Sequence, residues 1–262
     1  MPEKTEYTPG TFCWSELATT NPAAAKKFYT SLFGWTATDM TAGEEGVYTM
    51  LNLGGKEAGA LFSQQKEQRL AGVPPHWLCY VSVANADEAL AKVTSSGGKV
   101  VAGPFDVMEY GRMAIVQDPT GATLALWQPK KHIGARVSGE PGTACWNELA
   151  TRDTGIAGRF YTRVFDWTER TQEMGPTTYT SFMQGEVPSG GMLKMTEEWA
   201  GIPPHWMVYF AVADCDVSAA SARALGGEVK VPPTDIPKVG RFAILQDPQG
   251  AMFSIITLEA QA

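Results

Sequence analysis

Hydrophobic residues follow two periods along this chain. After a helix cap at Asn21 and a proline at the first helical position, apolar side chains recur at helical spacing until Gly34 stops the pattern, at Ala25, Phe28, Tyr29, Leu32 and Phe33. A second helix is predicted to begin after Asn85 and to end at Gly97. Short runs that alternate with a period of two precede and follow each helix, as half-buried strands do. The pattern predicts the order strand, helix, strand, strand, strand, occurring twice in each half of the chain.

The halves are copies of each other. GTFCWSELAT begins at Gly10 and GTACWNELAT at Gly142, an offset of 132 residues. GRMAIVQDPTGA begins at Gly111 and GRFAILQDPQGA at Gly240, an offset of 129 residues. A long internal repeat indicates duplicated folding units. We therefore expect one domain over residues 1–130, a linker over residues 131–141 and a second domain over residues 142–262.

Composition narrows the possible partners. The 262 residues include 21 Lys and Arg against 28 Asp and Glu, a formal net charge of −7, which argues against a nucleic-acid partner. Neither a signal-like N-terminus nor an apolar run of about 18 residues is present, so we expect no membrane partner and a cytoplasmic location. The four cysteines lack C-x-x-C spacing, which argues against a zinc cage or a disulfide framework.

The FY…FGW ending of the first helix, at Phe28–Tyr29 and Phe33–Trp35, and the GR…DPxG turn at Gly111–Gly121 resemble the vicinal oxygen chelate superfamily. This group includes glyoxalase I, bleomycin-resistance proteins, fosfomycin-resistance enzymes and extradiol dioxygenases. The chain most resembles tandem members that are often described as hydroxylases. The resemblance implies an α+β fold with two tandem vicinal oxygen chelate domains. Each domain would contain two βαβββ modules that form a U-shaped sheet, with helices outside and a ligand in the trough.

Alternation along the strands then predicts which side chains face each trough. Trp77, Cys79 and Val81 are apolar and should pack under the helices, which turns Leu78 and Tyr80 inward. On the first strand, Phe12, Trp14 and Glu16 share the inward face, whereas Cys13 and its counterpart Cys145 should face the helices as inert core residues. The predicted ligand-binding residues are Trp14, Tyr48, Met50, Leu78, Tyr80 and Trp127 in the first copy, and Trp146, Tyr179, Met207 and Tyr209 in the second.

The resemblance also locates the positions at which metal-dependent relatives hold their ion. They fall on Trp14, His76 and Ala125, and in the second copy on Trp146, His205 and Ser254. An indole nitrogen only donates and alanine has no lone pair, so each set keeps a single imidazole as an effective ligand. The one remaining histidine of the three in the sequence, His132, lies in the predicted linker. We therefore expect no metal and no cofactor, and argue against glyoxalase I and extradiol dioxygenase activity. A weak metal site from Glu16, His76 and water is the remaining alternative.

Four residues are candidates for proton transfer. An inward carboxylate beside tryptophan, as at Glu16 and Glu148, either pairs with an arginine or has its pKa raised by desolvation. Arg112 and Arg241 are the candidate partners, and a structural ion pair with them is the simpler interpretation. Imidazole titrates near neutrality, so His76 and His205 could act as general acids or bases. The alternative for each histidine is a hydrogen bond at the start of a strand. All four are kept as candidate catalytic residues.

Two functions remain. The first is a metal-free protein that binds a small hydrophobic or aromatic molecule in an aromatic trough, as bleomycin-resistance relatives do. The second is a metal-independent enzyme of the hydroxylase, isomerase or lyase type, which acts on a secondary metabolite or carbonyl compound with Glu16 or His76 as acid or base. Because two fused domains can supply the pairing that single-domain relatives obtain by dimerising, both a monomer and a homodimer are compatible with the sequence.

Overall fold

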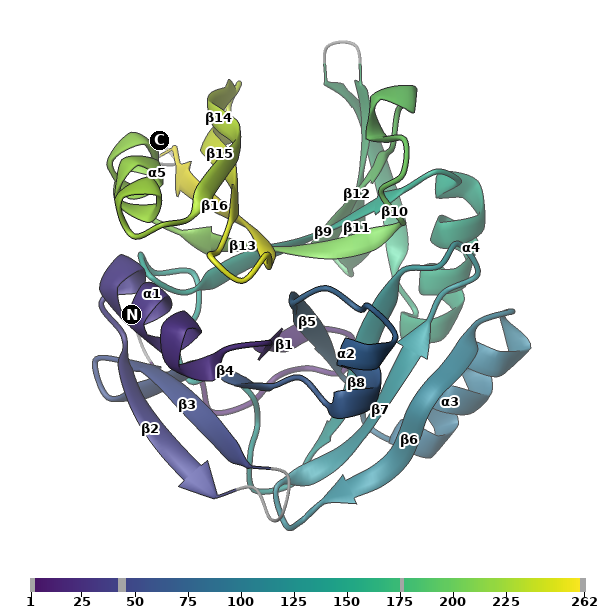
Figure 1. Ribbon diagram of the computed structural model, residues 1–262. Helices are drawn as coiled ribbons and strands as arrows, with labels where there is room; N and C mark the ends of the chain where they lie inside the picture. The colour runs from purple at the N-terminus through teal and green to yellow at the C-terminus, as the bar shows by residue number, and fades with distance from the viewer. Residues whose placement is uncertain (1–2, 42–45, 175–176, 260–262) are drawn as a thin grey trace.

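The computed structural model describes residues 3–41, 46–174 and 177–259 and shows two eight-stranded sheets, one in each half (Figure 1). The N-terminal half contains β1 (Phe12–Thr19), α1 (Pro22–Phe33), β2 (Thr36–Thr41), β3 (Val47–Leu53), β4 (Lys56–Ser63), α2 (Lys66–Leu70), β5 (His76–Ser82), α3 (Ala86–Ser95), β6 (Lys99–Val107), β7 (Gly111–Gln117) and β8 (Thr123–Pro129). The C-terminal half contains β9 (Ala144–Thr151), α4 (Thr154–Phe165), β10 (Thr168–Met174), β11 (Thr177–Gln184), β12 (Val187–Lys194), the 3₁₀ turn η2 (Glu197–Trp199), β13 (His205–Ala211), α5 (Cys215–Ala224), β14 (Glu228–Ile236), β15 (Gly240–Gln246) and β16 (Met252–Leu258).

The strand order identifies two βαβββ modules in each sheet. It is β2-β3-β4-β1-β5-β8-β7-β6 in the first sheet and β10-β11-β12-β9-β13-β16-β15-β14 in the second. The modules meet where β1 pairs antiparallel with β5, and β9 with β13. The Asn21 side chain caps α1 by accepting from the Ala24 amide, and Gly34 ends it in the left-handed conformation, as the sequence pattern predicts. The expected fold class is confirmed.

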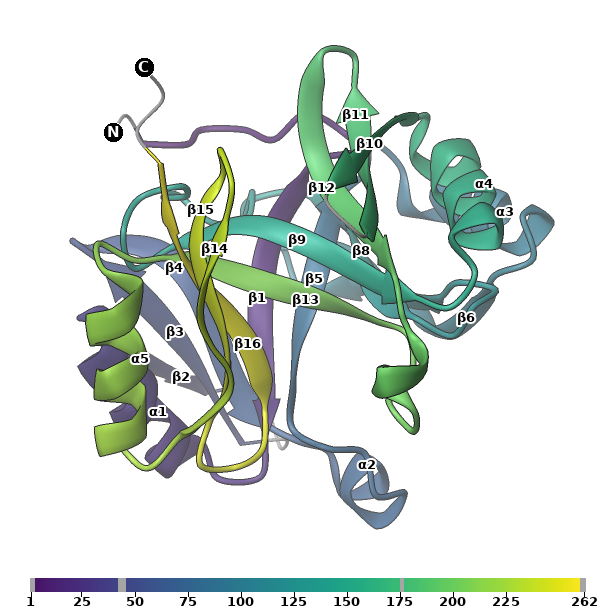
Figure 2. The ribbon, with the colours of Figure 1, turned by 90° about the horizontal axis from the view of Figure 1, so that it is seen from above.

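Both sheets curve into open troughs that face away from each other. In Figure 1 the arms of the upper sheet, β14–β15 and β10–β12, rise on either side of β13 and β9, and the lower sheet opens downward between β2–β3 and β6–β7. Helices α1, α3, α4 and α5 lie on the outer side of each trough, where α1 contacts α5 and α3 contacts α4 across the two halves. Figure 2, from above, shows β9 and β13 crossing over β1 and β5. Within the described residues, no helix is long and apolar enough to cross a membrane.

The helix-covered faces of the two sheets form one shared core. A single cluster of buried side chains includes Leu17 and Trp77 from the first half and Phe210 and Phe253 from the second. Ring centroids of Phe33 and Phe210 lie 4.9 Å apart. The residues that alternation assigns to the core of each copy therefore pack against the other copy.

Two reciprocal hydrogen bonds connect the halves inside this core. The Tyr29 hydroxyl donates to Asp247 Oδ2 at 3.0 Å, and the Tyr161 hydroxyl donates to Asp118 Oδ2 at 2.8 Å. The other oxygen of Asp118 accepts the backbone amide of Gly121, as expected for the turn that the sequence predicts. The repeated Asp-Pro turns thus also hold the two halves together.

The tryptophan of each FGW or FDW segment has the same role. Trp35 Nε1 donates to the Gly142 carbonyl at 2.6 Å, and Trp167 Nε1 donates to the Gly10 carbonyl at 2.8 Å. Both acceptors belong to the opposite half of the chain. The sequence features that indicate the family therefore build the seam between the domains and lie outside the troughs.

One prediction about the first strand is wrong. The pairing of β1 with β5 shifts by one residue between Phe12 and Trp14, and a matching shift occurs at Cys145 in β9. A β-bulge of this kind inserts an extra residue and reverses the alternation beyond it. Cys13 therefore lies in the trough-side cluster, and Phe12 packs against the shared core, 5.0 Å from the ring of Trp206.

Candidate functional site

The N-terminal trough contains a cavity of about 870 Å³. Among the predicted ligand-binding residues, it is lined by Trp14, Tyr48, Met50, Tyr80 and Trp127. Leu78 packs in one buried cluster with Trp14, Tyr80 and Trp127 but does not line the cavity. Alternation along β3, β5 and β8 brings these side chains together from strands that are far apart in the sequence. A cavity of this size with several aromatic side chains in its wall is suited to a flat, apolar small molecule.

Glu16 contributes a carboxyl group to the wall of this cavity. Its Oε2 accepts a hydrogen bond from the Tyr48 hydroxyl at 2.9 Å, and its Oε1 accepts one from the Tyr80 hydroxyl. Trp14 Nε1 donates to the Tyr48 oxygen at 3.4 Å. Strands β1, β3 and β5 of one sheet therefore hold a chain that runs from indole to phenol to carboxyl to phenol. We call it the N-terminal acid chain.

The acid chain changes the protonation chemistry of its members. Burial raises the pKa of the Glu16 carboxyl, and hydrogen bonds from Tyr80 and Tyr48 offset only part of this effect. Burial and the neighbouring carboxylate raise the pKa of both tyrosines well above the usual range, so their hydroxyls stay protonated. The wall thus presents a carboxyl group whose pKa is shifted towards neutrality, held by two phenolic donors.

The C-terminal trough repeats this arrangement. Trp146 Nε1 donates to the Tyr179 hydroxyl at 2.9 Å, and the Tyr209 hydroxyl donates to Glu148 Oε1 at 2.7 Å. Burial raises the pKa of Glu148, and hydrogen bonds from Tyr209 and Tyr179 lower it in part. Met207 and Tyr209 form the buried floor of this trough with Ile256. The predicted residues of the second copy are therefore also brought together.

The expected pairing of Glu16 with Arg112, and of Glu148 with Arg241, is wrong. Arg112 Nε lies 2.9 Å from Asp87 Oδ2, and Arg241 Nε lies 2.6 Å from Asp216 Oδ2. Both arginines lie on the outer surface, where the first turns of α3 and α5 supply the aspartates. Two phenolic hydroxyls take the place of the expected cation at Glu16.

His76 and His205 stand at the starts of their strands. His76 Nδ1 lies 2.9 Å from the Pro74 carbonyl oxygen, and His205 Nδ1 lies at the same distance from that of Pro203. His76 is absent from the lining of the large cavity. This geometry matches the strand-start alternative, and a role for either histidine in proton transfer stays a prediction.

His132 also belongs to the site, although no sequence pattern indicates it. After β8 the chain folds back over the trough, and the imidazole of His132 packs edge-on against Trp14 with ring centroids 4.8 Å apart. Its backbone carbonyl accepts from Trp127 Nε1 at 2.8 Å. Burial lowers the pKa of His132 to about 4, so its ring is neutral at pH 7. A polar, glycine-containing segment between two repeats gives no local signal of such packing.

The residues at the family's metal positions do not fit a metal ion. Trp14 donates its only N–H to Tyr48, and Ala125 contributes a methyl group to the buried wall. Within the described parts of the chain, no three His, Cys, Asp or Glu side chains come together that could hold a metal. A metal ion at these positions would therefore lack a ligand set.

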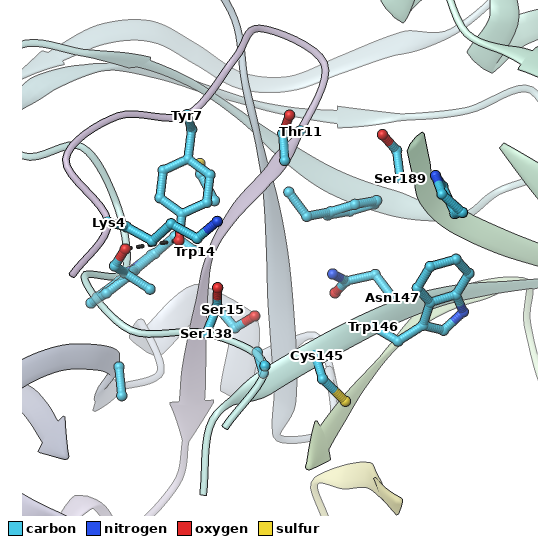
Figure 3. A pocket seen from close by; sticks show the side chains of 17 residues that line it. Lys4, Tyr7, Thr11, Trp14, Ser15, Ser138, Cys145, Trp146, Asn147 and Ser189 are labelled. Atoms are coloured by element: carbon cyan, nitrogen blue, oxygen red, sulfur yellow. Dashed lines mark hydrogen bonds between the residues drawn. The ribbon is translucent and has the colours of Figure 1, made fainter. Parts of the chain in front are cut away.

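A second cavity, of about 240 Å³, lies where β1 approaches β9 (Figure 3). Equivalent positions of the two copies line it, including Cys13 with Cys145 and Ser15 with Asn147. Burial raises the pKa of the Cys145 thiol to about 12, which keeps this cysteine in its unreactive thiol form. Trp14 lines both cavities, so its indole is a wall between the large trough and the seam.

A sequence model of the Glyoxalase/Bleomycin resistance protein/Dioxygenase superfamily matches residues 12–126 and 146–255. The chain belongs to this superfamily. The match falls once on each half, in agreement with the two sheets. The chain is also 45% identical over 258 residues to "Putative glyoxylase CFP32" of Mycobacterium tuberculosis, and the alignment covers 98% of both chains. It is 36% identical over 264 residues to the anthracycline biosynthesis protein DnrV of Streptomyces peucetius, covering 97% of this chain and 95% of the relative.

Solved structures share the fold at low sequence identity. The 2,3-dioxygenase LapB from Pseudomonas sp. KL28 superposes with a TM-score of 0.67 at 12% identity, covering 96% of this chain and 93% of that one. The Mn(II)-bound glyoxalase from Novosphingobium aromaticivorans gives a TM-score of 0.68 at 15% identity, covering 96% and 83%. At such identities the likeness concerns the fold alone, because one fold supports many chemistries.

Proposed function

We propose that the protein binds a flat hydrophobic or aromatic small molecule in the N-terminal trough, without a metal. The observation that carries this proposal is the 870 Å³ cavity with Trp14, Tyr48, Tyr80 and Trp127 in its wall. Aromatic rings offer large apolar areas and stacking geometries to a planar ligand. The residues at the family's metal positions supply no ligand set, so binding energy has to come from this wall.

The internal repeat offers a matched test. Met113 on β7 lines the cavity, and its counterpart in the second trough is Phe242 on β15. Met113→Trp should narrow the first trough and weaken binding of fluorene by about tenfold. Phe242→Trp places the same bulk in the other trough and should leave this binding unchanged. Quenching of tryptophan emission and calorimetric titration measure both affinities.

The outcomes separate clearly. Fluorene binding that both variants retain would place the ligand elsewhere, and no binding of planar hydrocarbons to the wild-type protein would overturn the proposal. Metal analysis of the purified protein gives an independent check. Stoichiometric zinc, nickel or iron would contradict a metal-free trough.

Glu16 favours a second candidate function, a metal-independent enzyme that acts on a secondary metabolite or carbonyl compound. Its half-buried carboxyl lines the cavity, and its pKa is shifted towards the range in which a general acid works best at neutral pH. Similarity to a protein of anthracycline biosynthesis supports a polycyclic substrate. Under this proposal Glu16→Gln abolishes turnover and retains binding, whereas Glu148→Gln leaves turnover in the first trough intact. Turnover that survives Glu16→Gln would exclude Glu16 as the acid.

A further inference from the structure

At one end of the N-terminal acid chain, each hydrogen bond has a single possible direction. An indole N–H only donates, so Trp14 obliges the Tyr48 oxygen to accept. The single hydroxyl proton of Tyr48 then points to Glu16 Oε2, 2.9 Å away. This end of the chain is therefore fixed, with Glu16 Oε2 as an acceptor.

The other end of the chain has two possible states. When Glu16 is ionised, its Oε1 accepts the proton of the Tyr80 hydroxyl. When Glu16 is protonated, Oε2 is already an acceptor, so the carboxyl proton belongs on Oε1 and is donated to the Tyr80 oxygen. A hydroxyl can accept and donate at once, which leaves the proton of Tyr80 available for another acceptor. Because Tyr80 lines the cavity, that acceptor can be an atom of a ligand.

We propose that Tyr80 donates a hydrogen bond to a carbonyl oxygen of the ligand, with protonated Glu16 as the donor behind it. This inference rests on the proposed function and narrows its ligand to planar aromatic ketones. Tyr80 is the group that contacts the ligand, and Trp14, Tyr48 and Glu16 are positioning residues that set the direction of its proton. No covalent bond forms or breaks in this arrangement.

The groups around Glu16 allow the protonated state. Among the described residues, Tyr48 from β3 and Tyr80 from β5 donate to Glu16, Trp14 on β1 also lies within its hydrogen-bonding reach, and none of the three carries a positive charge. Cys13 on β1 is a buried thiol near Tyr80, and Glu57 on β4 adds negative charge near Tyr48. His132 from the segment after β8 lines the cavity in its neutral form. Lys66 and Arg69 of α2 also line the cavity, with exposed side chains.

A pair of probes isolates the hydrogen bond. Fluorene and 9-fluorenone are planar and similar in shape, and only fluorenone has a carbonyl oxygen. The wild-type protein should bind fluorenone about fivefold more tightly than fluorene at pH values below the raised pKa of Glu16, as one net hydrogen bond allows. The preference should fall as the pH rises through the raised pKa of Glu16, because Tyr80 then donates to the carboxylate. The carbonyl stretch of bound fluorenone should lie at lower wavenumber below this pKa and move to higher wavenumber as the hydrogen bond is lost.

Variants identify the donor. Tyr80→Phe should remove the preference for fluorenone and the shift of its carbonyl stretch while fluorene still binds, and the matched Tyr209→Phe should change neither. Glu16→Gln retains an N–H donor towards Tyr80 and should keep the preference at every pH. Equal binding of both probes by the wild-type protein, or a preference that survives Tyr80→Phe, would overturn this inference and leave the proposed function standing. Failure of both probes to bind would overturn the two together.

Discussion

The two troughs share one polar chain and differ in the walls around it. Trp14 and Trp146 each donate to a tyrosine hydroxyl, at 3.4 Å and 2.9 Å, and a carboxyl group follows in both halves. Trp127, which covers the first trough, is replaced by Ile256 in the second. Trp14 is buried, whereas Trp146 is half-buried. The comparison shows that both copies hold the same indole, phenol and carboxyl groups, whereas the side chains around these groups differ.

A single glycine explains one part of this difference. Ala60 pairs with Glu16 in the first sheet, and Gly191 pairs with Glu148 in the second. A Cβ at Gly191 would lie 1.8 Å from the Tyr179 hydroxyl oxygen. The glycine therefore lets Tyr179 approach the sheet, and the hydrogen bond from Trp146 is correspondingly shorter than that from Trp14.

The largest expected effect is on the pH dependence of stability and comes from His132. Among the described residues, this histidine lines the first trough and has no histidine counterpart in the second. Its pKa is lowered by burial, and next by Arg136, from 6.5 to about 4. The unfolded chain therefore binds more protons between these values, so stability is lost as the pH falls from about 6.5 to about 4. The shift corresponds to roughly 3 kcal/mol at most. Denaturant unfolding at pH 7 and pH 4.5 should show His132→Phe to be less acid-sensitive by up to this amount. Equal acid sensitivity would contradict a buried neutral imidazole.

The two reciprocal hydrogen bonds between the halves should contribute equally to the free energy of unfolding. Tyr29→Phe leaves Asp247 and the Trp77 N–H without their hydroxyl partner, and Tyr161→Phe does the same to the equivalent pair. Each substitution should lower the free energy of unfolding by about 1–3 kcal/mol, because buried polar groups lose their hydrogen bonds. Chemical denaturation measures both. A large effect in one half and none in the other would show that the halves do not contribute equally to the seam.

A smaller effect is expected from making the second trough resemble the first. Gly191→Ala should displace Tyr179, weaken its bond with Trp146 and cost about 1 kcal/mol of stability. The chemical shift of the Trp146 indole proton reports that bond directly. Ala60→Gly is the reverse change in the first half and should leave the signal of Trp146 in place. An unchanged Trp146 signal in Gly191→Ala would mean that the glycine does not set this distance.

The smallest effect is expected at the outer arginines. Arg112 pairs with Asp87 on the surface and has no contact with Glu16, so Arg112→Met should leave the pKa of Glu16 unchanged. Carbon-13 NMR titration of the glutamate carboxyls measures this value. Arg241→Met is the matched change for Glu148. A shift of the Glu16 pKa in Arg112→Met would instead support an interaction between Glu16 and Arg112.

The alternation of side chains along the strands predicted many of the residues in the candidate site. Along β5, the period of two correctly separates Trp77, Cys79 and Val81 from Leu78 and Tyr80. The same rule fails on β1, because the bulge at Cys13 depends on pairing with a strand more than 60 residues away. Local patterns also gave no sign that His132 folds back onto Trp14, since that contact depends on the whole trough being built.

By itself, the sequence determined the duplication, the βαβββ order and the inward position of Glu16, because repeats and periodicity are local properties of the chain. Only the tertiary structure decided the partners of these residues. It directed the FGW and FDW tryptophans to the seam, gave Glu16 two tyrosines in place of an arginine, and placed His132 in the trough wall. Hydrogen-bond partners are chosen by distance in space among groups that compete during packing. Sequence separation carries little information about that choice.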